Sequence, residues 1–330
     1  MAPLPNMQAA IINYLKLHPL DAVPFNDKRE PLAARIWRIL NRSKFRSAPT
    51  APETIKAIQG HIHNQIKANQ PIILVYAMGG GRGINTHNFP HADWGEYLHL
   101  KFLVESLSPI GKIYEPGVEV RWTLDDYAAR IFNNYQPEWQ EMYTRGFDAM
   151  LEYFNQASGG AIKHIRIPTS TWYPDYDVLR SKLFSLAQAK VGTDEATEII
   201  SQWGKRAANN YYNADNLQGD ELQQAIEFST LLNMAWLDYD FEVRGDYLGA
   251  GIPIAHFTAL PDSLYIQTVP GSNVQFWKAN GYLEHKDGHW KSRIATRESW
   301  KQLEPQMTMI NNPLSGQLPD LGELPVLQAK

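Results

Sequence analysis

A glycine cluster followed by an arginine is the part of this sequence whose residue types best suit ligand chemistry. It stands directly behind the apolar run PIILVYA, residues 71–77, in the segment PIILVYAMGGGRGIN. Glycine backbone reaches conformations and close approaches that other residues cannot, and a guanidinium carries a permanent positive charge. The pattern therefore indicates a site for an anionic small molecule, such as a phosphate ester. The residues that could form it are Gly79, Gly80, Gly81, Arg82 and Asn85. The segment fits neither G-x-x-x-x-G-K-S/T nor G-x-G-x-x-G, so a flexible turn is the alternative.

Two carboxylates follow this cluster in the tetrapeptide Asp93-Trp94-Gly95-Glu96. The spacing is that of a capping box at the first turn of a helix. Asp93 and Glu96 could serve only as helix caps. Because a helix N-terminus beside a glycine loop is also where a polar ligand docks, they are equally candidates for amine binding or proton transfer.

His91 and Asp93 form an H-x-D triplet, which is the near half of a non-haem iron facial triad. His256 or His289 could complete the triad, with Arg293 to hold 2-oxoglutarate. In that fold, however, the triplet lies on a strand, and here it opens a helix. The sequence therefore predicts no metal site.

The last third of the chain adds a few further candidates. His256 stands in the apolar run IPIAHF and is a candidate acid or base, although a core histidine with a satisfied hydrogen bond is the alternative. Trp277 and Lys278 are candidates for substrate binding. Arg293 is a second possible anion contact, although two arginines four residues apart near the chain end, Arg293 and Arg297, are usually surface charges.

Composition narrows the classes of function. The chain has 330 residues, 44% of them hydrophobic, a net charge of -4 and no dense basic block, so nucleic acid is not an expected partner. It has no cysteine, which excludes disulfides, cysteine nucleophiles and thiolate metal sites. No run approaches the roughly 20 apolar residues that cross a bilayer, and the N-terminus lacks a signal-peptide layout. We expect a cytoplasmic protein that does not bind membranes.

The elements that must position these residues follow from periodicity. Three- and four-residue spacing of apolar residues predicts helices, short β-rich or alternating runs predict strands, and Pro and Gly mark their ends. The expected helices are 32–40, 54–66, from near 93 to Pro109, 137–154, and three within 175–234. The expected strands are 71–77, 118–122 and 164–168, followed by IPIAHF, SLYIQTV, NVQFW and HWKSRI. Asp287-Gly288 is a hairpin turn.

These elements predict an α/β fold, a Rossmann-like mixed sheet flanked by helices, with a helical N-terminal segment and a β-rich C-terminal part. We expect residues 1–68 to pack as helices on the main domain. Residues 69–310 would form the α/β catalytic-type domain, and 311–330 an irregular tail. The ligand site would lie at the carboxyl end of a strand.

Several spaced motifs resemble the isocyanide synthases of the pyoverdine/dityrosine biosynthesis family. That family has a strand ending in a loop with a basic residue and Asn, an acidic helix start, a Tyr-x-Pro-Gly turn, an acidic turn, a His-ending strand, a Trp-containing segment and a final Asp-Gly hairpin. The corresponding stretches here are 71–85, 91–96, 114–117, 124–126, 254–256, 275–278 and 287–293, which keep the family's order. Three departures stand out: Arg82 replaces a Lys, Lys278 replaces a His, and the arginine before the His-ending strand has no counterpart.

The resemblance implies an enzyme that condenses the α-amine of an aromatic amino acid with a phosphosugar such as ribulose 5-phosphate and leaves an isonitrile. It implies no metal and no nicotinamide cofactor. It gives Asp93, Glu96 and His256 catalytic roles. The substrate-binding residues would be Gly79, Gly80, Gly81, Arg82, Asn85, Asp125, Trp277, Lys278 and Arg293. A phosphosugar- or nucleotide-binding transferase and a non-catalytic small-molecule-binding relative are the alternatives. A homodimer is compatible with all three.

Overall fold

The computed structural model describes residues 5–18, 30–79, 81–248, 251–256 and 262–328. Its centre is a five-stranded, entirely parallel sheet with strand order β3-β2-β1-β4-β5. The strands are β1 (Ile72–Met78), β2 (Val118–Leu124), β3 (Ile162–Pro168), β4 (Ile252–Ala255) and β5 (Leu264–Tyr265). The apolar run predicted as a buried strand is the central β1, because a parallel strand covered on both faces needs apolar residues on both. The predicted Rossmann-like α/β fold is confirmed.

The strand order places a switch point beside β1. The chain runs outward from β1 to β2 and β3, and then returns to pair β4 with the opposite edge of β1. Tyr76 of β1 lies opposite Trp122 of β2 and Ile254 of β4. In such sheets ligands bind at the carboxyl ends of the strands where the order reverses. The glycine loop follows β1, and His256 follows β4, so both stand at that position.

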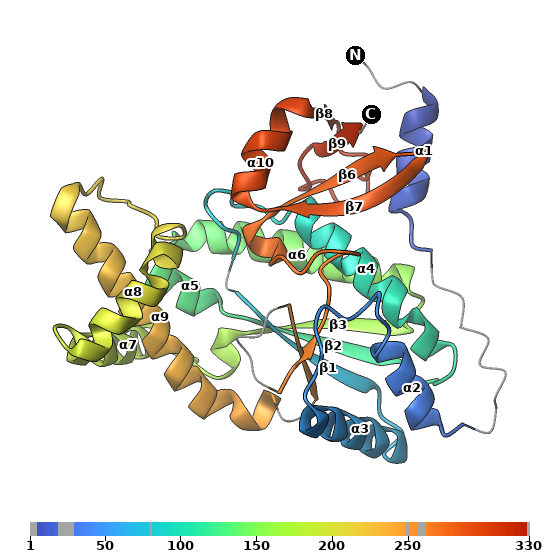
Figure 1. The fold of residues 1–330 in the computed structure, drawn as a ribbon, viewed down its shortest axis with the longest axis horizontal. Coiled ribbons are helices and arrows are strands. Elements are labelled where there is room, and N and C mark those ends of the chain that lie inside the picture. The colour runs from blue at the N-terminus through green and yellow to red at the C-terminus, as the bar shows by residue number, and fades with distance from the viewer. Residues whose placement is uncertain (1–4, 19–29, 80, 249–250, 257–261, 329–330) are drawn as a thin grey trace.

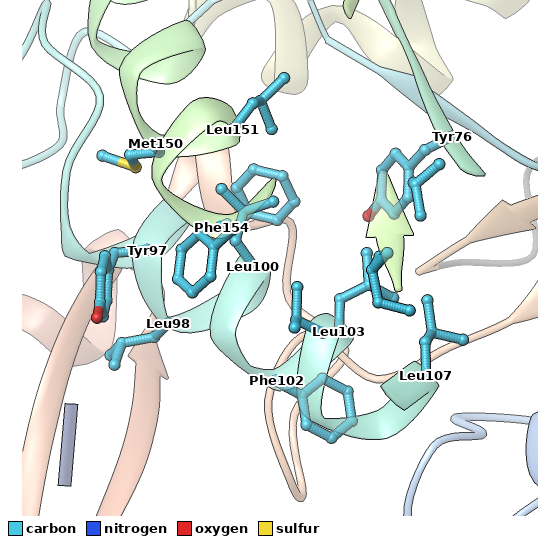
Figure 2. Packing of buried hydrophobic residues seen from close by; sticks show 14 of the residues in the cluster. Tyr76, Tyr97, Leu98, Leu100, Phe102, Leu103, Leu107, Met150, Leu151 and Phe154 are labelled. Atoms are coloured by element: carbon cyan, nitrogen blue, oxygen red, sulfur yellow. The ribbon is translucent and has the colours of Figure 1, made fainter. Parts of the chain in front are cut away.

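Helices cover both faces of the sheet (Figure 1). α2 (Leu32–Leu40) and α3 (Pro52–Lys67) lie on one side, and α4 (Trp94–Gly111) and α6 (Pro137–Ala157) on the other. Side chains of α4 and α6, including Leu100 and Phe154, interlock in the core (Figure 2). Nearly all of α4 is buried, because it lies between the main sheet and a second sheet.

Helix α4 continues two residues beyond Pro109, where the sequence predicted its end. A proline has no N–H to donate to the carbonyl four residues earlier. Here the Ser108 hydroxyl donates to that carbonyl, Glu105 O, at 3.0 Å. The neighbouring serine therefore replaces the hydrogen bond that Pro109 cannot make, and the helix is not broken.

The second sheet is mixed, with order β7-β6-β9-β8. Its strands are β6 (Asn280–Lys286), β7 (His289–Ala295), β8 (Met307–Ile310) and β9 (Leu324–Gln328), and α10 (Arg297–Leu303) joins β7 to β8. The irregular tail predicted for 311–330 is wrong for β9, which lies inside the sheet and pairs in parallel with β6. A strand this short has no sequence signal of its own. Leu324 and Val326 become core residues through pairing with distant partners.

The segment NVQFW also differs from its predicted strand. Residues Phe276–Lys278 form a short 3-10 helix, η2, between the two sheets. Within SLYIQTV, only Leu264–Tyr265 forms a strand, β5. The apolar residues of both segments are buried, which explains the strand-like pattern. Most of these residues do not pair with a neighbouring strand, so they do not form the predicted strands.

A group of helices stands apart from the sheets on the left of Figure 1 and has its own apolar cluster. It consists of α5 (Asp126–Asn133), α7 (Tyr176–Lys190), α8 (Asp194–Ala208) and α9 (Gly219–Leu248). The three helices predicted within 175–234 are therefore confirmed, and α5 was not foreseen. None of the helices in the described part of the chain is long and apolar enough to cross a membrane.

The N-terminal helices share the core of the main sheet. α1 (Pro5–Leu15) lies beside the second sheet, and its Ile11 and Leu15 belong to the same buried cluster as Leu100 and Leu324. The Tyr14 hydroxyl lies 3.0 Å from Ser292 Oγ on β7. Residues on α1, α4 and β9 therefore share one continuous apolar cluster.

Candidate active site

Arg82, Asp93 and Glu96 meet in a cluster that is closed to solvent. Arg82 Nη1 lies 2.5 Å from Glu96 Oε2, and Arg82 Nη2 lies 3.4 Å from Asp93 Oδ2. No more than 1% of any of these side chains is exposed. Tyr143 of α6 donates its hydroxyl to the other Glu96 oxygen at 3.3 Å. The arginine predicted to hold an anion is thus paired with the two predicted acids.

The helix cap explains how the acids are held. Asp93 is the N-cap of α4, and Glu96 Oε2 accepts the Asp93 backbone N–H at 3.0 Å. The predicted capping box is confirmed. Because the same oxygen also accepts from Arg82, the cap and the ion pair are one network. The capping role and a role in chemistry are therefore compatible for Glu96.

The three charges shift one another's proton affinity. Burial raises the pKa of Asp93 to about 6, against the opposing effect of Arg82. Burial likewise raises the pKa of Glu96, again opposed by Arg82. Burial by itself would lower the pKa of Arg82, but its two carboxylate partners raise it overall. The net charge of one cation and two carboxyl groups is zero when one of the carboxyl groups is protonated. The cluster is therefore suited to exchange a proton near neutral pH.

A second buried group, here called the histidine cluster, consists of Tyr76, His99, His256 and Trp277. The His256 ring centroid lies 4.9 Å from that of His99 and 5.2 Å from that of Tyr76. The Trp277 ring lies edge-on to Tyr76 at 6.3 Å. These side chains come from β1, α4, the end of β4 and η2, so only the tertiary structure brings them together.

Hydrogen bonds fix the tautomers of both histidines. His99 Nδ1 lies 2.8 Å from Thr268 O, and His256 Nδ1 lies 3.2 Å from Ile266 O. A carbonyl oxygen can only accept, so each ring donates from Nδ1 and keeps Nε2 as an acceptor. Burial lowers the pKa of His99 to about 4. Burial, followed by the charge of His99, lowers the pKa of His256 well below its usual value. Both rings are therefore neutral at pH 7.

Several polar atoms of the histidine cluster have no hydrogen-bond partner among the described residues. They are Tyr76 Oη, His99 Nε2, His256 Nε2 and Trp277 Nε1. Buried polar atoms are normally paired, because an unpaired one costs about 1–3 kcal/mol. Two hydrogen-bond donors and two acceptors stand together here. That is the arrangement a polar ligand would use.

Phe276, the first residue of η2, touches both buried clusters. Its carbonyl oxygen lies 3.4 Å from Arg82 Nη1. Its ring stacks on His99, with centroids 4.5 Å apart and planes at 18°. The charge cluster and the histidine cluster therefore flank one residue and form one continuous region.

The glycine loop packs directly on Trp277. A Cβ atom at Gly79 would lie 2.5 Å from the Trp277 indole nitrogen, closer than real Cβ atoms approach. The Gly83 N–H donates to Trp277 O at 2.8 Å. Glycine at position 79 is thus needed for close packing against η2. Gly80 lies outside the described residues.

An open cleft of about 570 Å³ lies where the glycine loop, η2, α8 and α10 come together. That volume suits a small-molecule ligand. The charged residues that line it are Lys205, Arg206, Lys278, Arg297 and Glu298, four cations and one acid. Asn85 also lines the cleft, and its amide donates to Asn209 O at 2.9 Å. The balance of charge favours an anionic ligand.

Most residues predicted for the site gather around η2. Asp93, Glu96, Arg82 and His256 lie on its buried side, and Asn85 and Lys278 line the cleft. Asp125 follows β2, and its backbone N–H lies 3.4 Å from Met78 O, at the same end of the sheet as the glycine loop. Arg293 is different: it lies on β7 in an ion pair with Glu284 at 2.7 Å and does not line the cleft.

Sequence reasoning missed several residues that the structure brings to the site. They are Tyr76, His99, Tyr143 and Arg206, whereas Arg297, which the sequence indicated as a surface charge, lines the cleft. Tyr76 and His99 stand in runs that read as apolar core, and their polar atoms become notable only when burial is known. Arg297 occupies the first turn of α10, where a cation is unfavourable because that helix end is positive. No helix was predicted over residues 297–303, so this signal was not available from the sequence. Within the described residues no group of three or more His, Asp or Glu side chains could hold a metal ion.

Comparison with solved structures identifies a protein of similar fold. The PvcA (PA2254) protein from Pseudomonas aeruginosa superposes with a TM-score of 0.63 at 17% identity, over 90% of this chain and 100% of that chain. At this identity the likeness shows the fold. No protein-family model and no curated protein sequence matches the chain.

Two other solved structures match more weakly. A CDPS from Fluoribacter dumoffii has a TM-score of 0.32 at 12% identity, over 67% of this chain and 86% of that chain. A tyrosyl-tRNA synthetase complexed with L-tyrosine from Archaeoglobus fulgidus has a TM-score of 0.33 at 13% identity, over 68% of this chain and 55% of that chain. Scores this low carry no argument about the site.

Proposed function

We propose that this chain is an isocyanide synthase-like enzyme. It condenses the α-amine of an aromatic amino acid with the ketone of a phosphosugar such as ribulose 5-phosphate, and carbon–carbon cleavages then leave the isonitrile carbon. The observation that carries the proposal is the meeting, at η2, of a basic cleft with buried acids and unpaired polar atoms. Condensation of an amine with a phosphorylated ketone needs each of these parts.

The phosphate group belongs in the cleft. Lys205, Arg206 and Arg297 supply positive charge there, beside Lys278 in the same cleft, and hydrogen bonds to charged groups are the stronger kind. Arg82 does not take this role directly, because its guanidinium is buried between two carboxylates. We therefore assign anion binding to the cations that line the cleft, and not to Arg82 in the glycine loop.

Proton transfer belongs to the charge cluster. Forming and breaking an imine requires protons to move at nitrogen and oxygen, and an acid with a pKa near the working pH does this best. Asp93, with its pKa raised to about 6, meets that requirement, and Glu96 shares the same cation. Burial raises the pKa of both acids, and Arg82 opposes that rise, so Arg82 is a positioning residue.

The amino acid substrate belongs beside the histidine cluster. Aromatic rings of this kind can pack against a tyrosine or tryptophan side chain. The acceptor nitrogens of His99 and His256 can receive hydrogen bonds from an amine. His256 keeps the acid/base role expected of it, here as a neutral base.

Two independent lines support this proposal. The motifs that resemble isocyanide synthases occur in the family's order, and five of them, 71–85, 91–96, 124–126, 254–256 and 275–278, border the candidate site or the sheet edge beside it. In addition, the fold shared with PvcA extends over 90% of the chain, so the likeness is not confined to short motifs.

The direct test is incubation of the protein with tyrosine or tryptophan and ribulose 5-phosphate, followed by mass spectrometry for the isonitrile. The expected result is product with one of these amino acids, strongly reduced in Glu96→Gln. Glu141→Gln is the matched control, because Glu141 is exposed on α6 and lies away from the cleft. If no aromatic amino acid gives product while ribulose 5-phosphate still binds, the transferase or binding-protein alternative takes its place.

A further inference from the structure

Lys278 stands between the open cleft and the buried histidine cluster in the chain. It is the last residue of η2, directly after Trp277, which packs on Gly79 and Tyr76. Its own side chain lines the open cleft. A single short turn therefore connects a lysine that lines the cleft to the residues of the buried clusters.

The surroundings of Lys278 are unusual for a lysine. Among the described residues its ammonium group has no carboxylate within ion-pair distance. The cleft adds Arg206, Lys205 and Arg297 as further cations, with Glu298 as the only acid. Burial, followed by the charge of Arg206, lowers the pKa of Lys278 to about 7. A lysine that is desolvated, has a neighbouring arginine and has no carboxylate partner can act as a nucleophile near neutral pH.

A lysine that served only to hold phosphate would be better placed in a fully charged state. Three other cations already line the cleft for that purpose. A cation that loses its charge near neutral pH contributes less to anion binding than its neighbours do. In its neutral form the amine has a lone pair that can attack an electrophile. In the proposed reaction, the electrophile that enters this cleft is the ketone carbon of a phosphosugar.

We propose that Lys278 Nζ forms a covalent imine with the carbonyl carbon of the phosphorylated sugar. The amine lone pair attacks the carbonyl carbon, and a carbinolamine forms. The two amine hydrogens then leave with the carbonyl oxygen as water, and a C=N bond replaces C=O. The α-amine of the amino acid displaces the lysine from this imine and restores the free amine. The identity of the ligand rests on the proposed function, but imine formation requires only the sugar phosphate.

The test is reductive trapping. The protein is mixed with ribulose 5-phosphate and sodium cyanoborohydride, without amino acid, and the products are analysed by intact mass and peptide mapping. The expected result is one adduct per chain, on the peptide that contains Lys278, saturable with ligand and suppressed by inorganic phosphate. The reagent reduces the C=N bond to a stable secondary amine, so the adduct survives digestion.

Variants at position 278 test whether the trapped adduct forms on this lysine. Lys278→Arg keeps the positive charge but cannot form the imine, and we expect at least a tenfold loss of adduct with a melting temperature close to that of the parent protein. Lys278→Met is a second variant that also removes the charge. Lys301→Arg is the matched control, because Lys301 is exposed on α10 and does not line the cleft.

The two proposals fail in different ways. Absence of an adduct at Lys278, or equal labelling of many lysines, overturns the imine whatever the isonitrile assay shows. Full isonitrile formation by Lys278→Arg also overturns it, while leaving the proposed function in place. An adduct at Lys278 without any isonitrile product supports the imine and counts against the proposed function.

Discussion

Arg82 and Glu96 hold each other in the interior, with Arg82 Nη1 2.5 Å from Glu96 Oε2 and neither side chain exposed. The guanidinium that looked like an anion-binding group therefore serves first to stabilise buried carboxylates. This relationship moves ligand charge recognition to the cleft and leaves the acids available for proton transfer.

Removing the cation should strongly destabilise the fold. Arg82→Met leaves Asp93 and Glu96 buried without their partner, and loss of one member of a buried ion pair costs about 3–5 kcal/mol. Urea unfolding measures this change. Arg293→Met is the control, because its partly exposed pair with Glu284 should cost about 1 kcal/mol or less. Neutralising the acids as well, with Asp93→Asn and Glu96→Gln, should restore much of the loss. Equal effects of Arg82→Met and Arg293→Met would contradict the buried cluster.

Asp93 should make the folded protein less stable as the pH rises, whereas a carboxyl group with a lowered pKa has the opposite effect. Its pKa is raised to about 6 from about 3.8, so between these values the folded state binds more protons than the unfolded state. The free energy of unfolding contributed by Asp93 therefore decreases as the pH rises, by up to about 1.4 kcal/mol per pH unit. The measurement is the difference between the parent protein and Asp93→Asn from pH 4 to 7. Buried neutral histidines act in the opposite direction, and the difference removes their effect.

The control for this pH series is Asp320→Asn. Asp320 is partly exposed and pairs with Arg145 at 3.3 Å. A difference curve for Asp93→Asn no steeper than the curve for Asp320→Asn would show that Asp93 is not held in a desolvated site.

Gly79→Ala should disturb the packing of η2. The new methyl group would lie 2.5 Å from the Trp277 indole nitrogen, so the tryptophan must shift. We expect a loss of about 1–3 kcal/mol in the free energy of unfolding, a change in tryptophan fluorescence and reduced isonitrile formation. Gly60→Ala is the matched control. Gly60 lies inside α3 with open space around it, and alanine there should stabilise by about 0.5–1 kcal/mol. A tolerated Gly79→Ala would show that the loop and Trp277 move freely.

Arg297→Ala should weaken phosphosugar binding without weakening the fold. A hydrogen bond between charged groups contributes about 1.5–3 kcal/mol, so we expect the Kd for ribulose 5-phosphate to rise by roughly tenfold or more. Isothermal titration calorimetry measures this change. Stability should stay level or increase slightly, because a cation at a helix N-terminus is unfavourable. Lys301→Ala on the same helix serves as the control. If both variants bind ribulose 5-phosphate like the parent protein, the cleft is not the phosphate site.

Features that depend on near neighbours could be predicted from the sequence. The capping box of Asp93 and Glu96 needs residues only three apart, and it forms as expected. The apolar run at β1 indicated a buried central strand. Asp287 and Gly288 both adopt positive φ, 53° and 76°, as the predicted hairpin turn requires. Each of these signals is set by local backbone geometry or by the character of one short segment.

Features that depend on distant partners could not be predicted. The sequence by itself determined an α/β fold with a glycine loop after its central strand, and acids at the next helix. Only the tertiary structure decided that Arg82 turns inward to Glu96, and that β9 enters the second sheet. It also decided that Lys278 shares a cleft with cations from α8 and α10. The physical reason is that burial and pairing decide the partner of a charge, and both depend on residues far apart in the chain.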